Sequence, residues 1–411
     1  MGAMTTPSFE QGPIRPPSEA ASLLVRVIRN CGWNRCRFCP VYKGCRSSLR
    51  SVDEVLADVA AMRAAADVLE RATAAEGRTG RTTGEPGKAP SDAPSDTRSE
   101  AVSDALSDAL HAGLVPPEAV QVALFLREGG RAVFLQDADP CAVAPEKLVA
   151  VLEHTRELFS SVTTVTAYGR TATLARRRPS DLSRLAAAGL TRVHVGMESG
   201  ADAVLTRVDK GCTAAQLIQA GRQVLEAGIE LCFYVMPGLG GRDLIDEHVR
   251  GTAAVLREVA TAASPECPLV VRLRTTAVVS GTPLAADEAV GRFALPDDIE
   301  VAAELRALLE QLDGVRLELR SAHLLNLLPG LEGSLPADRA RLAAVLDELL
   351  ALPAAEQAEF ALGARVGVFR EPPDRLDSQR QAALRRRVAG SDDAGASEKL
   401  EAAKRIRARF L

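Results

Sequence analysis

The sequence is poor in aromatic residues and has no excess of positive charge. Phe, Trp and Tyr make up 3% of its 411 residues, and there is one tryptophan. This scarcity disfavours platforms on which nucleic-acid bases stack. Fifty Lys and Arg residues against 54 Asp and Glu residues give a formal net charge of −4, whereas a broad nucleic-acid-binding surface needs a basic excess. We therefore expect a small-molecule ligand and no nucleic-acid partner.

Long apolar runs are also missing. No stretch approaches the roughly 18–20 residues that cross a bilayer. Residues 1–20 are polar and proline-rich, without the apolar core of a secretory signal. The sequence thus predicts a disordered N-terminus over residues 1–20 and a cytoplasmic protein without a membrane partner. Disulfides are rare in the reducing cytoplasm, so eight cysteines suggest metal or redox chemistry first.

Strand-like and helix-like segments alternate between residues 21 and 285. The predicted strands cover residues 23–28, 132–136, 162–167, 192–196, 230–236 and 269–275, and each except the last precedes a predicted helix. Such alternation produces a parallel sheet with right-handed crossovers. Six units are too few for a closed eight-fold barrel. We therefore expect an α/β fold, a partial (β/α)6 TIM-like barrel.

Two segments do not follow this alternation of strands and helices. Residues 77–100 are rich in Gly, Pro, Ser and Thr and cannot bury enough apolar surface to offset ordering, which predicts a disordered insertion. Residues 286–411 have helical periodicity at 300–312, 336–352 and 354–362, with one extended run at 315–319. This region is predicted to be a mostly helical C-terminal appendage.

Three cysteines follow the first predicted strand. Cys31, Cys36 and Cys39 are spaced C-x4-C-x2-C, on a loop of the kind that forms the active-site face of parallel α/β barrels. Three thiolates can hold three irons of a cubane cluster and leave the fourth iron open, with Phe38 as a shield from solvent. Two alternatives are a zinc site completed by Cys45 and a redox dithiol formed by Cys36 and Cys39.

The cysteine loop CGWNRCRFC (31–39) resembles the signature of radical S-adenosylmethionine (SAM) enzymes. Their usual spacing is C-x3-C-x2-C with an aromatic residue before the last cysteine, so the first gap here is one residue longer. HVGMESG (194–200) followed by Leu205 and Lys210-Gly211, YVMPGLGG (234–241) and SGTPL (280–284) are similar to motifs of one subgroup. That subgroup includes the oxygen-independent coproporphyrinogen oxidases and the methylthiotransferases. The resemblance covers about residues 22–285.

The resemblance implies an oxygen-sensitive enzyme in which Cys31, Cys36 and Cys39 ligate a 4Fe-4S cluster. The cluster would reductively cleave SAM to a 5′-deoxyadenosyl radical, which abstracts hydrogen from a small molecule, with a flavodoxin or ferredoxin as electron donor. The implied SAM-binding residues are Phe38, Gln136, Asp137, Asp139, Glu198, Gly238, Gly240 and Gly241. The substrate candidates are Tyr168, Arg170, Arg272, Arg274 and His323.

Each of these positions also has a plainer interpretation. Asp137 and Asp139 follow a strand, where a carboxylate can accept from an ammonium group or simply cap a helix. Glu198 can bind a ribose hydroxyl or the methionine amine, or act as a cap, and glycines let the backbone approach adenine. The arginines can bind a carboxylate or be structural. The rival functions are a coproporphyrinogen-oxidase-like tetrapyrrole enzyme, a non-catalytic haem or metal carrier, and a zinc-stabilised α/β binding module.

Overall fold

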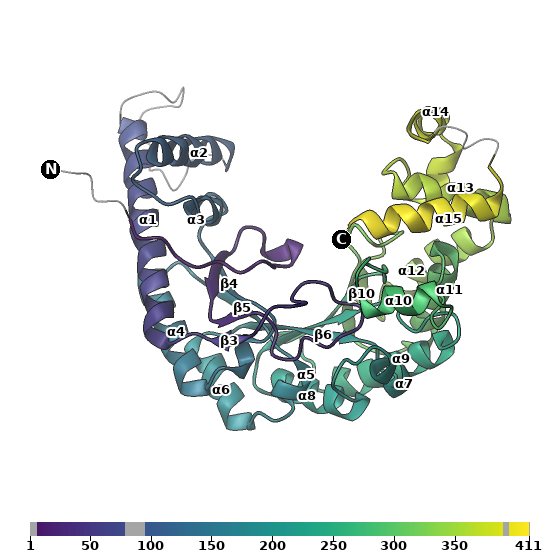
Figure 1. The fold of residues 1–411 in the computed structure, drawn as a ribbon, viewed down its shortest axis with the longest axis horizontal. Helices are drawn as coiled ribbons and strands as arrows, with labels where there is room; N and C mark the ends of the chain where they lie inside the picture. Colours follow the sequence, from purple (N-terminus) through teal and green to yellow (C-terminus); the bar gives the residue numbers. More distant parts are fainter. Residues whose placement is uncertain (1–5, 79–94, 389–393, 411) are drawn as a thin grey trace. The chain divides into compact units, whose positions relative to one another are not determined.

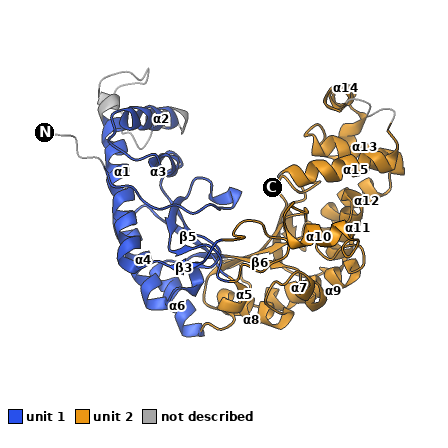
Figure 2. Ribbon diagram, in the orientation of Figure 1, with its two compact units in different colours: residues 1–32, 45–169, 178–193 blue, residues 33–44, 170–177, 194–411 orange. Residues whose placement is uncertain are grey.

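The computed structural model describes residues 6–78, 95–388 and 394–410. The chain divides into two compact units (Figure 2). Unit 1 contains residues 1–32, 45–169 and 178–193, and unit 2 contains residues 33–44, 170–177 and 194–411. Many elements of each unit are labelled in Figure 1. Because the cysteine loop crosses the division, Cys31 lies in unit 1 and both Cys36 and Cys39 lie in unit 2.

Unit 1 is built on three parallel strands in the order β1-β4-β5. β4 reads AVFLQ, and four of its five residues are buried, which is typical of a parallel strand covered on both faces. The strands are β1 (Leu23–Arg26), β4 (Ala132–Gln136) and β5 (Thr164–Tyr168). A separate antiparallel pair is formed by β2 (Ile28–Arg29) and β3 (Ser48–Leu49). The helices are η1 (Pro17–Glu19), α1 (Val52–Arg78), α2 (Ser95–His111), α3 (Ala119–Arg127), η3 (Pro140–Ala142), α4 (Pro145–Leu158) and α6 (Pro179–Ala188).

The N-terminal segment differs from its prediction. Residues 6–20, expected to be disordered, pack on unit 1, with Phe9 buried. The backbone N–H of Gly12 donates to Gln136 Oε1 at 2.8 Å, and Gln136 Nε2 donates back to Gly12 O at 3.2 Å. A single polar side chain at the end of β4 thus satisfies the backbone of a segment that has little apolar content of its own.

Unit 2 contains strands in the order β6-β7-β8-β9-β10. β7 (Glu230–Val235), β8 (Leu269–Leu273) and β9 (Leu317–Arg320) pair in parallel, and β10 (Gly333–Leu335) is antiparallel to β9. β6 (Arg192–Glu198) belongs to this unit from His194 onward. The helices are α5 (Thr171–Leu174), α7 (Asp202–Arg207), α8 (Ala214–Glu226), α9 (Ile245–Ala260), α10 (Pro283–Ala289), α11 (Asp298–Gln311), α12 (Arg339–Leu350), α13 (Ala354–Arg365), η4 (Pro372–Leu376), α14 (Ser378–Arg387), α15 (Ala396–Arg407) and η5 (Ala408–Phe410).

The predicted fold class is confirmed as a mostly parallel α/β architecture with a largely helical C-terminal part. The extended run predicted at 315–319 is more than an interruption, because β9 adds a further parallel strand beside β8. Most of the predicted insertion, residues 79–94, lies outside the described residues, between the end of α1 and the start of α2. No helix in the described residues is long and apolar enough to span a membrane.

A buried charge cluster ties the C-terminal helices of unit 2 together. Asp298, the first residue of α11, accepts hydrogen bonds from Arg365 of α13 at 2.5 Å and from Arg407 of α15 at 2.8 Å. All three side chains are at most 2% exposed. Burial alone would raise the pKa of Asp298, but Arg365 and Arg407 outweigh it and lower that pKa. The carboxylate is therefore held ionised between two cations.

Candidate active site

Two of the three clustered cysteines lie at the ends of one tight turn. The N–H of Cys39 donates to the carbonyl of Cys36 at 3.3 Å, a spacing that places the two residues close together. Both side chains are half-buried, as is that of Cys31, and none of the eight cysteines forms a disulfide. The turn therefore presents two thiols at one place without burying them fully.

Backbone hydrogen bonds hold this turn independently of the sulfur atoms. The N–H of Arg37 donates to Val208 O at 2.9 Å, and the N–H of Leu284 donates to Arg37 O at 3.0 Å. The Arg37 guanidinium also pairs with the Asp287 carboxylate. Arg37, which lies between the two cysteines, is thus fixed by the residue after α7 and by two residues of α10.

Trp33 anchors the earlier part of the loop. Its indole N–H donates to Asp209 O at 2.7 Å, and its ring lies against Gly211. The guanidinium groups of Arg35 and Arg170 lie 4.8 and 5.1 Å from the ring centroid, within the range of cation–π attraction. Arg170, a predicted substrate residue, therefore contacts the tryptophan of the cysteine loop.

An apolar cluster joins the cysteine loop to the loop that follows β7, residues 236–241, here called the glycine loop. Phe38 packs against a set of buried residues that comprises Ala201, Val204, Val208, Met236, Leu239, Leu284, Phe293 and Leu295. Met236 and Leu239 flank Gly238 in the chain. The structure therefore brings together two of the motifs that sequence reasoning had proposed for the cofactor.

Beside this cluster lies the ion pair of Glu198 and Lys210. The Lys210 ammonium donates to Glu198 Oε1 at 2.7 Å, and both side chains are less than one-fifth exposed. Burial would lower the pKa of Lys210, but the Glu198 carboxylate and then the Cys36 thiol outweigh it, so that pKa is raised. Lys210 is therefore a permanent cation close to Cys36.

Gly196 and Glu198 have local reasons for their identities. A Cβ atom on Gly196 would overlap Glu198 Oε1 and lie 2.8 Å from Lys210 Nζ, so the ion pair occupies the space of a side chain. Glu198 itself has a φ of +63°, a left-handed conformation that is uncommon outside glycine. Sequence reasoning noted Lys210 within the resemblance but did not select it, although a lysine after a strand-end glutamate was the available signal.

The glycine loop owes its composition partly to local packing. Gly238 and Gly241 have φ values of +84° and +64°, which glycine adopts without strain. A Cβ atom on Gly240 would lie 2.7 Å from the carbonyl oxygen of Leu244. The buried N–H of Gly238 donates to both carboxyl oxygens of Glu304, at 3.1 and 2.9 Å. Glu304 of α11 thus positions the glycine loop. This role could not be read from the sequence, because Glu304 lies 66 residues after Gly238.

Glu304 and His248 form a buried pair that is neutral at pH 7. Their side chains are 3% and 2% exposed, with His248 Nε2 3.3 Å from Glu304 Oε1. Burial, partly offset by the Gly238 amide, raises the pKa of Glu304 to about 8. Burial lowers the pKa of His248 to about 4. A protonated Glu304 stabilises the fold at acidic pH, and this contribution is lost as pH rises through 8.

We predict that Glu304→Gln flattens the pH dependence of stability between pH 6.5 and 8. His248 titrates with the opposite sign between about 4 and 6.5, so the upper window isolates Glu304. Over that window the wild type should lose about 1–2 kcal/mol that the glutamine variant keeps. Glu304→Leu should cost about 1–3 kcal/mol at every pH, because it strands the buried Gly238 N–H.

Thermal unfolding at several pH values measures this effect. Glu310→Gln on the same helix is the matched control, because the Glu310 side chain is 75% exposed and should leave the wild-type profile unchanged. Parallel profiles for wild type and Glu304→Gln would show that Glu304 is ionised in the folded protein.

The acidic segment after β4 holds the start of the cysteine loop. Asp137 is fully buried and accepts from Arg26 Nε at 2.5 Å and from the N–H of Asn30 at 3.3 Å. Gln136 binds the N-terminal segment, and Asp139 is buried next to η3. Asp137 therefore positions the residue that precedes Cys31, while binding of SAM by Gln136, Asp137 and Asp139 stays a prediction.

The predicted substrate residues are distributed over the two units. In unit 1, Tyr168 packs edge-on against Phe134 with centroids 5.1 Å apart. In unit 2, Arg272 and Arg274 lie along β8 and its continuation, and burial and the charge of Arg274 lower the pKa of His323 to about 4. Arg272, Arg274 and His323 thus belong to one neighbourhood of unit 2.

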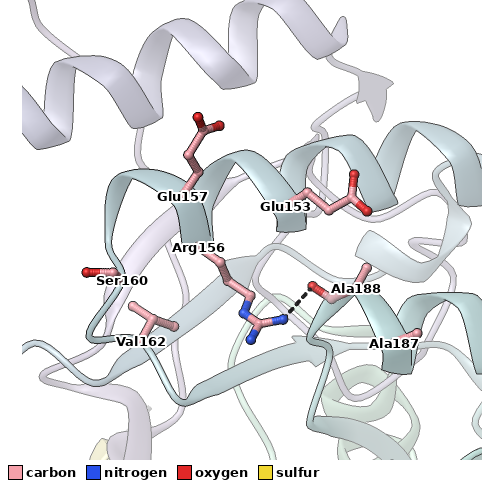
Figure 3. Close-up of a pocket in the computed structure, with 7 residues that line it drawn as sticks. All are labelled: Glu153, Arg156, Glu157, Ser160, Val162, Ala187 and Ala188. Atoms are coloured by element: carbon pink, nitrogen blue, oxygen red, sulfur yellow. Dashed lines mark hydrogen bonds between the residues drawn. The ribbon is translucent and has the colours of Figure 1, made fainter.

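A surface pocket of about 430 Å³ lies away from these residues (Figure 3). Its lining comes from α4, the turn before β5 and the end of α6, namely Glu153, Arg156, Glu157, Ser160, Val162, Ala187 and Ala188. Arg156 donates to Ala188 O across it at 3.4 Å. Ligands of parallel α/β folds bind at the carboxyl ends of the strands. This pocket instead lies at the amino ends of β5 and β6.

The described residues contain no group of three or more His, Cys, Asp or Glu side chains arranged to hold a single metal ion. The chemistry of the cysteine loop nevertheless fits an iron–sulfur cluster. Such clusters are ligated by thiolates, and a nearby cation such as Lys210 stabilises a thiolate. Cys36, Cys39 and Lys210 are together in unit 2.

Comparison with known families supports this chemistry. Residues 113–253 match the Radical SAM superfamily. The match begins after the cysteine loop and ends before β8, and it includes Glu198 and the glycine loop. This part of the chain is similar to a radical SAM domain, which indicates an enzyme. It confirms the predicted 4Fe-4S cluster and SAM as the cofactors of the superfamily, whereas the subgroup and the individual ligands stay predictions.

Several solved structures are also similar to the chain at low identity. The cobalamin-dependent SAM radical enzyme OxsB has 13% identity, with 95% of this chain and 54% of that chain covered and a TM-score of 0.42. The methyltransferase TsrM from Kitasatospora setae has 14% identity, with 67% and 41% covered and a TM-score of 0.41. Methylornithine synthase (PylB) has 14% identity, with 79% and 68% covered and a TM-score of 0.39.

The chain spans about half the length of the first solved structures that it resembles, with 54% of OxsB and 41% of TsrM covered. No curated protein sequence matches the chain.

Proposed function

We propose that this protein is a radical SAM enzyme that acts on a small molecule, with Cys31, Cys36 and Cys39 as the ligands of its 4Fe-4S cluster. The observation that supports this best is the joint packing of Phe38 and the glycine loop on one apolar cluster. When bound, the cluster and SAM supply a one-electron cleavage of SAM and hydrogen abstraction from the substrate. Reduction requires a low-potential donor such as a flavodoxin or ferredoxin.

The residues of the chain have separate tasks in this proposal. Lys210 lies near Cys36 and balances the negative charge of the thiolates. Phe38 keeps water from the sulfur atoms, which raises the strength of every electrostatic interaction there. Glu198 orients Lys210 and offers an acceptor for the amine or ribose of SAM, and the glycine loop lets its backbone approach adenine.

Anaerobic reconstitution with iron and sulfide tests the proposal. We expect about four irons and four sulfides per chain, and release of 5′-deoxyadenosine when the reduced protein meets SAM. Analytical chromatography measures that product, and omission of the reductant is the control. Zinc at one equivalent without iron would favour a zinc-stabilised binding module. A stable cluster that never cleaves SAM would indicate a carrier.

A further inference from the structure

Two arginines, Arg272 on β8 and Arg274 just after its end, lack side-chain partners among the described residues. Among the described residues, neither Arg272 nor Arg274 makes a side-chain hydrogen bond or an ion pair, and the Nε atom of each is buried. Both side chains are only half-exposed. A partly buried cation is costly unless it is paired, and arginines elsewhere in unit 2, such as Arg242 and Arg365, have carboxylate partners. The guanidinium groups of Arg272 and Arg274 are thus available to pair with a ligand.

The alternation of β8 puts both side chains on the same face. Residues two apart on a strand share a face and lie roughly 6–7 Å apart, and the N–H of Arg274 continues the strand pairing by donating to Val235 O at 2.9 Å. The opposite face carries Leu269, Val271 and Leu273, all at most 2% exposed. On the neighbouring β7, Leu231 of that apolar face contacts α8 at Gly221. The arginines therefore lie on the face that α8 does not cover.

Further polar groups share this face. In the strand register, Arg272 is flanked by Tyr234 on β7 and Arg320 on β9. The Tyr234 hydroxyl is 3.2 Å from His194 Nδ1, and Arg320 is already paired with Glu318 at 3.0 Å. Arg272 and Arg274 consequently remain the unpaired cations of the row.

The loop after β9 adds a neutral donor next to Arg274. Asn326 fixes this loop by accepting from the N–H of Thr275 at 2.8 Å and donating to Leu273 O at 2.8 Å. His323 Nδ1 accepts from the N–H of Leu325 at 3.1 Å, so its Nε2 carries the proton. Two guanidinium groups and one imidazole N–H are therefore donors near the carboxyl end of β8.

We infer that Arg272 and Arg274 bind an anionic group, a carboxylate or a phosphate, of the small-molecule substrate. This inference rests on the proposed function, because it names the substrate class of that enzyme. Two arginines side by side suit a planar or tetrahedral oxyanion, since each offers a fork of N–H donors. His323 contributes an uncharged donor to the same group.

Calorimetric titration of the full chain at low salt tests the inference, with inorganic phosphate and succinate as separate probes. We expect saturable binding of at least one probe, which identifies the phosphate or the carboxylate chemistry. Arg272→Gln and Arg274→Gln should each weaken that binding at least tenfold, and Arg274→Lys should weaken it less. Arg316→Gln, an exposed arginine just before β9, is the charge-matched control and should bind as the wild type does.

The outcomes separate this inference from the proposed function. Cys36→Ala should keep probe binding even where cluster chemistry is lost. Failure of the wild type to bind either probe, or unchanged binding by both glutamine variants, would overturn the inference. Thermal unfolding checks that the variants fold, and the probe should raise the unfolding temperature of the wild type but not of the double Arg272→Gln, Arg274→Gln variant.

Discussion

Replacing Cys36 by alanine is expected to abolish both cluster assembly and SAM cleavage. Even changes behind a metal ligand cost about 10–100-fold in affinity or activity, so loss of a ligand should reduce 5′-deoxyadenosine release by more than about 100-fold. The fold should survive, because Arg37 is held by Val208 and Leu284 without any contribution from sulfur. Iron content, the electron paramagnetic resonance signal of the reduced protein and circular dichroism measure the three effects.

Cys45 provides the matched control for this variant. It lies six residues after Cys39 and is exposed. Cys45→Ala should keep the cluster and the cleavage reaction if three cysteines suffice, whereas a four-cysteine zinc site would lose its metal in both variants. Cleavage that survives in Cys36→Ala would show that the ligand assignment is wrong.

Asp298→Asn is expected to destabilise unit 2 by about 3–5 kcal/mol, because it leaves two buried cations without their shared anion. Arg365 and Arg407 are 2% and 0% exposed, so water cannot replace the carboxylate. The lowered pKa of Asp298 has a matching consequence. Its stabilisation is present above the usual carboxyl pKa and is lost as pH falls through the lowered value.

Urea unfolding followed by circular dichroism, with hydrogen exchange on α13 and α15, measures the cost. Asp347→Asn is the control, because its ion pair with Arg306 is exposed and such pairs contribute about 0–1 kcal/mol. Adding Arg407→Met to Asp298→Asn should recover part of the loss by removing one stranded charge. If Asp298→Asn lowered the free energy of unfolding by less than about 1 kcal/mol, the charge cluster would not stabilise the packing of these helices.

Local patterns predicted most of the elements. The strand Ala132–Gln136 has the predicted bounds, and the helix Pro145–Leu158 follows it as expected, because an apolar run and a 3.6-residue period are readable within a short window. Gly189 ends α6 with a φ of 114°, as expected of a glycine after a helix. These features depend on neighbours in the chain, which the sequence displays directly.

Contacts between distant segments were harder to predict. The sequence predicted β9 only as an isolated extended run. Its partner β8 precedes it by more than forty residues, and no short-range sequence pattern indicates parallel pairing. Glu304 was missed for the same reason, since it meets Gly238 from another element. Lys210 stood in a noted motif, but its role depends on Glu198, Gly196 and Cys36 being close in space.

The anchoring of Trp33 has a practical consequence. The chain has one tryptophan, and its indole lies in the cysteine loop, hydrogen-bonded to Asp209 and flanked by two guanidinium groups. All tryptophan fluorescence of the protein therefore originates at this loop. An iron–sulfur chromophore assembled a few residues away would quench that emission by energy transfer. The protein therefore carries a built-in optical reporter of metallation, readable in anaerobic solution without any label.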